Sequence, residues 1–136
     1  MNRNDFLNVE QKILDEAKER EESNIIYLEK IRLEAIVNIP QRITSCINEI
    51  NEELKKVAEL AKSYYSKENV DIFIEHFHPA QIDSVINAIN EYLKTSGFKE
   101  YDVKYECRTI NINYEDCNDK SYEIRGLSIY INPWRK

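Results

Sequence analysis

Glycine is scarce in this sequence, with only Gly97 and Gly126 among 136 residues. A phosphate-binding loop needs several closely spaced glycines, because only glycine lets the backbone approach a phosphate closely. The chain therefore cannot contain a P-loop or the glycine-rich fingerprint of a dinucleotide-binding domain.

Long apolar runs are also missing, since no stretch reaches the roughly 18 apolar residues of a membrane-spanning helix. The three cysteines, Cys46, Cys107 and Cys117, are an odd and sparse set that fits a reducing compartment better than a disulfide framework. Residues 1–5 lead straight into charged sequence without the apolar region of a signal peptide. We therefore expect a cytoplasmic protein, in the host cell if it is viral, with no membrane partner.

An excess of basic residues is lacking as well. The 19 lysines and arginines are outnumbered by 25 aspartates and glutamates, which gives a net charge of −6. A general nucleic-acid binder needs a basic face that releases counterions from the phosphates. Nucleic-acid binding is therefore not expected, whereas an acidic surface suits solubility or contact with a basic partner.

The first segment, from residue 4 to residue 37, predicts a long helix. Three of its leucines and one alanine recur at multiples of seven, at Leu7, Leu14, Leu28 and Ala35. Between them, residues 15–24 are almost wholly charged, which is typical of a solvated helix face. A break near Ser23 is the alternative to one continuous helix.

A second helix is predicted from Pro40 to about residue 65, because proline fits a first helical turn while the residue before it avoids helical geometry. Its apolar residues are spaced alternately by four and three: Ile43, Ile47, Ile50, Leu54, Val57, Ala61 and Tyr64. This seam predicts either an antiparallel hairpin within one chain or the interface of a homo-oligomer. Both hold at once in a four-helix arrangement.

The remaining sequence changes its period. Residues 70–77 alternate as a strand does, and Pro79–Ser96 carries one apolar helical face that ends at Gly97, with Phe98 covering the helix end. Two further strands follow, and the apolar parity of both switches near Arg108 and Gly126. Paired switches predict a bulge or bend across a hairpin.

These elements predict an α+β fold in a single domain, residues 1–136. A helical hairpin or oligomerisation half (4–66) precedes a βαββ half (69–134), in which the third helix covers one face of a three-stranded sheet.

Candidate metal and catalytic residues are few. His76 and His78 share one face of the predicted strand, and Cys107 or Cys117 is a further zinc donor. No Cys-x-x-Cys pair accompanies them, and no spacing places a nucleophile beside a base. We expect no catalytic residue, no metal and no cofactor, and keep a small metal protein or enzyme as the lesser alternative.

Aromatic and basic side chains gather in the last third of the chain. Guanidinium groups beside aromatic rings suit recognition of a phosphate and a base together. The predicted ligand-binding residues are Arg108, Arg125, Trp134, Tyr105 and Tyr122. The competing interpretation is a sheet edge protected by charge.

The stretch from Val70 to Trp134 resembles a pattern of small phage-encoded proteins. It is carried by Gly97-Phe98, Tyr101-Asp102-Val103 and Ile129-Tyr130-Ile131 before Trp134. The chain is similar in this respect to the Thoeris anti-defence family, whose members are non-enzymatic sponges that hold cyclic ADP-ribose-type signals between paired subunits. The resemblance implies no individual binding residue.

Two functional hypotheses follow. The first is a non-enzymatic, viral-type homo-oligomer that sequesters a small cyclic nucleotide and so blocks host antiphage defence. The alternative is a protein–protein inhibitor or adaptor that contacts a host protein through its acidic helices.

Overall fold

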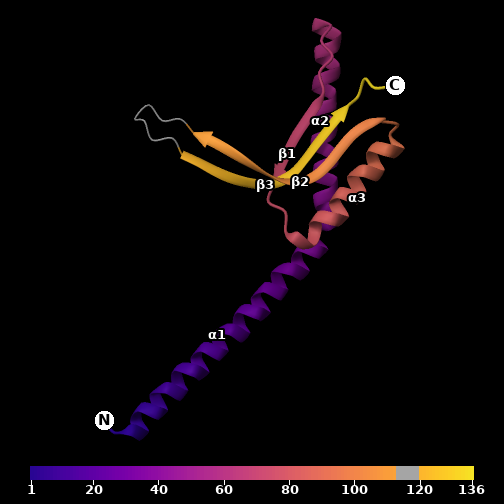
Figure 1. Cartoon of the computed structure of the whole chain (residues 1–136). Helices are drawn as coiled ribbons and strands as arrows, with labels where there is room; N and C mark the ends of the chain where they lie inside the picture. Colours follow the sequence, from indigo (N-terminus) through magenta and orange to yellow (C-terminus); the bar gives the residue numbers. More distant parts are fainter. Residues whose placement is uncertain (113–119) are drawn as a thin grey trace. The chain divides into compact units, whose positions relative to one another are not determined.

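The chain forms two compact units in a computed structural model that describes residues 1–112 and 120–136 (Figure 1). One unit is Met1–Val37 and the other is Asn38–Lys136. The expected halves met near residue 67, whereas this division falls after Val37 and groups the second helix with the sheet. The fold is α+β, in the order α1 (Arg3–Val37), α2 (Ile39–Tyr64), β1 (Val70–Glu75), α3 (Pro79–Thr95), β2 (Glu100–Ile112) and β3 (Lys120–Asn132).

The first unit is a single helix, α1, without a break near Ser23. Its first turn is closed by a reciprocal pair of hydrogen bonds, in which the Asp5 amide donates to Asn2 Oδ1 and the Asn2 amide donates to Asp5 Oδ2, both at 3.0 Å. Side-chain pairs one turn apart, such as Arg32 with Glu29 at 3.0 Å, add weak support along its solvated surface.

The second unit begins with α2, and Pro40 lies in its first turn as predicted. The helix ends where Tyr65 turns to a left-handed conformation (φ 54°) and its amide donates to the Ala61 carbonyl. None of the described helices has the length and apolarity that crossing a membrane requires.

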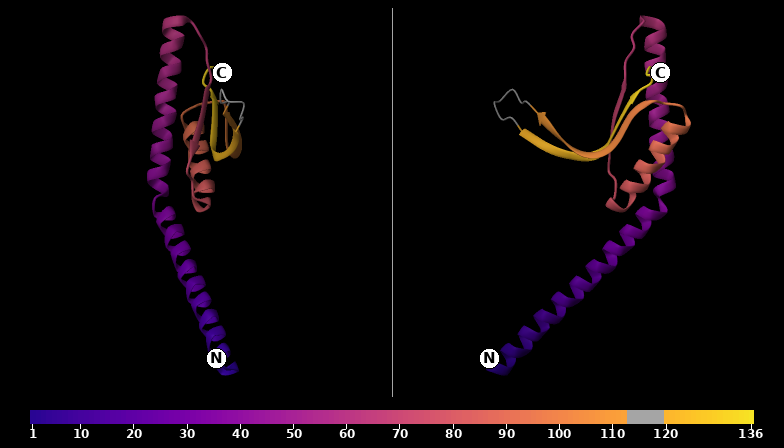
Figure 2. Two further views of the ribbon diagram at one scale, coloured as in Figure 1. Left: turned by 90° about the vertical axis from the view of Figure 1, so that its left-hand side faces the viewer. Right: turned by 45° about the vertical axis from the view of Figure 1, so that its right-hand side comes forward.

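The three strands form an antiparallel sheet in the order β1-β3-β2. The β2–β3 register runs without interruption from the Glu100–Asn132 pair to the Ile112–Lys120 pair, so of the two predicted forms, a bulge or a bend, the bulge is wrong. The strands bend instead, and beyond the last β1 pair, Glu75 with Gly126, they turn away from α3 as a two-stranded arm (Figures 1 and 2). The parity switch arises because the apolar residues change from one sheet face to the other in this arm.

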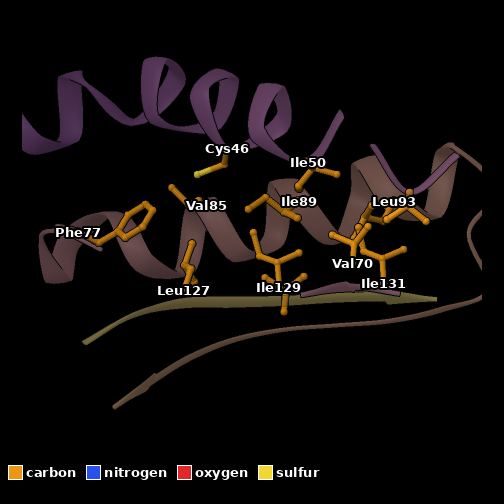
Figure 3. Packing of buried hydrophobic residues seen from close by; sticks show 12 residues of the cluster. Cys46, Ile50, Val70, Phe77, Val85, Ile89, Leu93, Leu127, Ile129 and Ile131 are labelled. Atoms are coloured by element: carbon orange, nitrogen blue, oxygen red, sulfur yellow. The ribbon is translucent and has the colours of Figure 1, made fainter. Parts of the chain in front are cut away.

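The core lies between the sheet and two helices. Leu127, Ile129 and Ile131 of β3 project from one sheet face into the same cluster as residues of α2 and α3 (Figure 3). That cluster also contains Cys46, Ile50, Val57, Val70, Phe77, Val85, Ile89, Leu93 and Val103. Both helices therefore cover this face, whereas the sequence assigned it to the third helix alone.

The α2 seam is largely used inside this core. Ile50 and Val57 are buried, and Ile43 and Leu54 pack against the cluster. Their neighbours are α3 and β1, a pairing that neither sequence alternative included. Ile47 and Ala61 are half-buried and Tyr64 is exposed, so the burial of the seam fades toward the end of α2.

The end of α3 follows the local rules of its sequence. Gly97 has φ +90°, and its amide donates to the Lys94 carbonyl while the Phe98 amide donates to the Leu93 carbonyl. This is the Schellman pattern of hydrogen bonds. Phe98 packs against the core, which confirms its predicted place over the helix end.

The two histidines do not share a strand face, because β1 ends at Glu75. His76 lies in the connection with φ 69° and a side chain that is 90 % exposed. His78 is the N-cap of α3, where its Nδ1 accepts a hydrogen bond from the Ala80 amide at 3.0 Å. The predicted His-x-His arrangement on a strand is thus wrong, since one histidine faces solvent and the other caps a helix.

Candidate functional site

The sheet face opposite the helices carries the main polar cluster of the second unit. We call it the open face. Because Leu127, Ile129 and Ile131 point into the core, the alternation of a strand places Ser128 and Tyr130 on the other side. The register adds Asp71 and Phe73 from β1 and Glu106 and Arg108 from β2 to this face.

Arg108 is the centre of this cluster. Its Nη2 donates to Ser128 Oγ at 2.8 Å and to Asp71 Oδ1 at 3.3 Å, and its Nε donates to Glu106 Oε1 at 3.1 Å. The guanidinium carbon lies 4.4 Å from the centre of the Phe73 ring. Arg108 therefore joins all three strands through charge-assisted bonds and a cation–π contact.

These contacts depend on the bend of the hairpin. Ser128 pairs with Lys104, four residues from Arg108 along β2. On a straight strand, positions four residues apart are separated by about 13 Å. An arginine side chain cannot span that distance. The open face is therefore the inner side of the bend, and the Arg108 contacts hold the bent form together.

The charged side chains of this cluster are paired with one another. Hydrogen bonding from Arg108, and then from Ser128, lowers the pKa of the Glu106 carboxyl. Hydrogen bonding to Glu106 is the main cause that raises the pKa of Arg108. Lys104 adds a second cation, with Nζ 3.5 Å from Glu106 Oε2. A carboxylate held ionised in this way is a poor proton acceptor, so the cluster is not suited to general base catalysis.

The Glu106 interaction predicts a pH-dependent contribution to stability. Because its pKa is lowered on folding, the contribution is fully present above the ordinary value of 4.5 and is lost as the pH falls through the folded pKa. We expect Glu106→Gln to lower the free energy of unfolding at pH 7, and the difference from wild type to shrink below pH 4.5. Urea titrations at several pH values measure it. Glu91→Gln, at an exposed position of α3, is the control, and a pH-independent difference at Glu106 would contradict the ion pair.

The five predicted ligand residues do not come together in one place. Arg108 pairs with Ile124 and Tyr122 pairs with Ile110, so these two predicted residues share the open face. Arg125 pairs with Cys107 and points to the opposite side. The arginines therefore lie on different faces although they are near neighbours in the hairpin.

Tyr105 and Trp134 lie elsewhere. Tyr105 pairs with Leu127 and so shares the face that the helices cover. Trp134 packs against the core near the end of α2, where its Nε1 donates to the Glu68 carbonyl at 2.8 Å. Trp134 follows the end of β3, whereas Arg125 lies beyond the last β1 pair, in the two-stranded arm.

The cysteines give no support to a metal or nucleophile site. Burial is the main cause that raises the pKa of Cys46 to about 11, so this thiol is protonated and enclosed in the core. Cys107 is exposed, with Sγ 3.5 Å from Glu123 Oε2. Cys117 lies outside the described residues. Among residues 1–112 and 120–136, no three histidine, cysteine or acidic side chains are placed to hold a metal ion.

The largest apolar exposure of the described residues is on α1, which sequence reasoning treated mainly as a solvated face. Large apolar side chains are exposed at Phe6, Leu7, Val9, Ile13, Leu14, Ile25, Ile26, Tyr27, Leu28, Leu33, Ile36 and Val37. Leu14 and Leu28 are 57 % and 54 % exposed. Monomeric proteins seldom expose apolar groups at this density unless the surface binds something.

Comparisons with known proteins found no matching family model, no similar curated protein and no similar solved structure. The class of this protein is therefore given by its architecture alone. A helical unit, α1, is followed by a unit in which α2 precedes a βαββ sheet domain. The resemblance to the Thoeris anti-defence family stays a prediction.

Proposed function

We propose that the protein is a non-enzymatic interaction protein that binds another protein helix through α1. Its second unit, residues 38–136, serves as the folded body that carries α1. The observation behind this proposal is the combination of length and exposure in α1: 35 residues form one helix, and its leucines and isoleucines are open to solvent except for the half-buried Ile31.

Helix energetics support this function. Most of the stability of a protein helix comes from packing one of its faces, because intrinsic propensity alone is marginal in water. Each exposed leucine also leaves about 2 kcal/mol of burial free energy unused. A partner that packs against α1 would stabilise the helix and also bury these leucines. Proteins commonly recognise an amphipathic helix by covering its apolar face in this way.

Capture of a cyclic nucleotide has weaker support from the geometry. Arg108 already makes contacts with two carboxylates, a hydroxyl and a ring. A phosphate would have to compete with Asp71 and Glu106 for the same donors. The adaptor hypothesis therefore stands ahead of the nucleotide sponge.

Photo-crosslinking in cells tests the proposal. A photoreactive residue at Leu28 of the full chain is expected to give one saturable crosslinked product. The same residue at Tyr122, which is 47 % exposed on the second unit, is the matched control and is expected to give none. No product from Leu28, or equal yields from both positions, would contradict the role of α1.

Thermal unfolding against cyclic nucleotides and ADP-ribose isomers tests the sponge directly. A bound ligand at 100 times its dissociation constant stabilises by about 2.7 kcal/mol, a shift of several degrees for a domain of this size. We expect no shift. A shift with one nucleotide class would replace the adaptor function by nucleotide capture.

A further inference from the structure

One stripe along the surface of α1 has the same order of apolar and polar residues from either end. Positions 14, 17, 21, 24, 28 and 31 follow one another at spacings of three and four and therefore lie on one side of the helix. They are Leu14, Ala17, Glu21, Asn24, Leu28 and Ile31. Two apolar residues, two polar residues and two apolar residues succeed each other.

From this order we infer that α1 pairs antiparallel with α1 of a second copy of the chain. The inference rests on the proposed function and names the partner. In this register Leu14 faces Ile31 of the second copy, and Ala17 faces its Leu28. Glu21 then faces Asn24, and the twofold symmetry repeats all three layers.

Charge favours this arrangement over a parallel one. In a parallel pair each residue meets its own copy, so the two Glu21 carboxylates would repel each other in the seam. In the antiparallel pair Glu21 meets the amide of Asn24, which can donate a hydrogen bond to a carboxylate. A polar layer at the centre of an apolar seam also fixes register, since a shift by one heptad sets both polar groups against apolar residues.

The rest of α1 agrees with this pairing. Ile13 and Tyr27 directly precede Leu14 and Leu28 and flank the stripe, so they widen its two apolar ends. Apart from Glu21, the charged residues between positions 15 and 22 lie outside the stripe and are exposed. Glu19 lies on the opposite side of the helix. Sliding the register by one heptad would place Leu14 opposite Asn24 and Ala17 opposite Glu21, which loses the match.

Sedimentation of the purified full chain measures the association itself. We expect a species of twice the 16.2 kDa chain mass that dissociates on dilution. A monomer at every concentration up to about 100 µM, where even weak helix pairs associate, would overturn the inference.

Disulfide trapping measures the direction of pairing. In a Cys107→Ser, Cys117→Ser background, Leu14→Cys and Ile31→Cys chains are expected to crosslink when mixed, while neither crosslinks alone. The two positions lie about 25 Å apart on one helix, so a chain bearing both cannot bridge them internally. Self-crosslinking of the Leu14→Cys chain would mean parallel pairing and would overturn the inference.

Substitution of the polar layer gives an independent readout. Glu21→Leu with Asn24→Leu should lower the dissociation constant about tenfold or more, because leucine then fills the central layers. The matched control, Asn8→Leu with Glu19→Leu, adds the same side chains outside the stripe and should leave it unchanged. Equal effects of the two pairs would contradict the stripe.

The outcomes separate this inference from the proposed function. Crosslinks from Leu28 to a different protein, with a monomeric purified chain, would refute self-pairing and leave the interaction role of α1 intact. No crosslink at all, with a monomeric chain, would refute both. A dimer trapped between positions 14 and 31 supports both.

Discussion

Gly126→Ala is expected to lower the free energy of unfolding by about 2–4 kcal/mol. A Cβ at this position would overlap the carbonyl oxygen of Ile74 and lie 3.1 Å from an edge carbon of the Phe73 ring. The first of these groups is backbone of β1, the strand that pairs with β3 here. It cannot withdraw without disturbing the Glu75–Gly126 pair and the start of the bend. Urea denaturation of the full chain measures the loss as a lower midpoint.

Gly97→Ala is the informative control for this substitution. No atom lies within 4 Å of a Cβ added at Gly97, but its φ of +90° disfavours any other residue. Loss of the left-handed cap costs roughly 1 kcal/mol. If Gly126→Ala were the milder of the two, the close approach of β1 and β3 would be refuted.

Sequence reasoning succeeded where the determining interactions are local. The proline in the first turn of α2 and the glycine cap of α3 act within a few residues, so α2 begins and α3 ends close to where those signals predict. The strand predicted over residues 70–77 is too long, because β1 ends at Glu75. Alternation continues to Phe77, but His76 leaves the strand with a left-handed conformation. Arg42 of α2 holds this turn by donating to the carbonyls of Glu75 and His76 at 3.0 and 3.2 Å, from 33 and 34 residues away.

The faces of the candidate site residues are set by strand register, which the local sequence does not determine. Arg108 and Arg125 were expected together because both lie near the bend. Their faces depend on the pairing of β2 with β3, and a pairing of Arg108 with Ile124 puts Arg125 on the other side. Nor does local sequence identify Asp71 as a partner of Arg108, since 37 residues separate them. The sequence did contain the α1 stripe, but its leucines were noted only at multiples of seven.

Because the α2 seam is part of the core, a substitution in it is expected to have the second large effect on the free energy of unfolding. Ile50 is fully buried beside Ile89 of α3, and Ile50→Ala should lower the free energy of unfolding by about 2–4 kcal/mol through lost burial and an added cavity. Ile50→Val, which removes one methylene group, should cost about 1 kcal/mol. Chemical denaturation monitored by circular dichroism gives both values.

Protein concentration separates the two uses of this seam. If Ile50 packs within its own chain, the loss caused by Ile50→Ala is the same at all concentrations. If the α2 seam were instead the interface of an oligomer, the loss would shrink on dilution, because chains that have separated no longer make the contact that the substitution removes. Ile26→Ala removes the same atoms from a 71 % exposed position of α1 outside the proposed stripe, and should stay within about 0.5 kcal/mol of wild type. A concentration-independent loss at Ile50 together with a mass that changes on dilution would assign folding to α2 and association to α1.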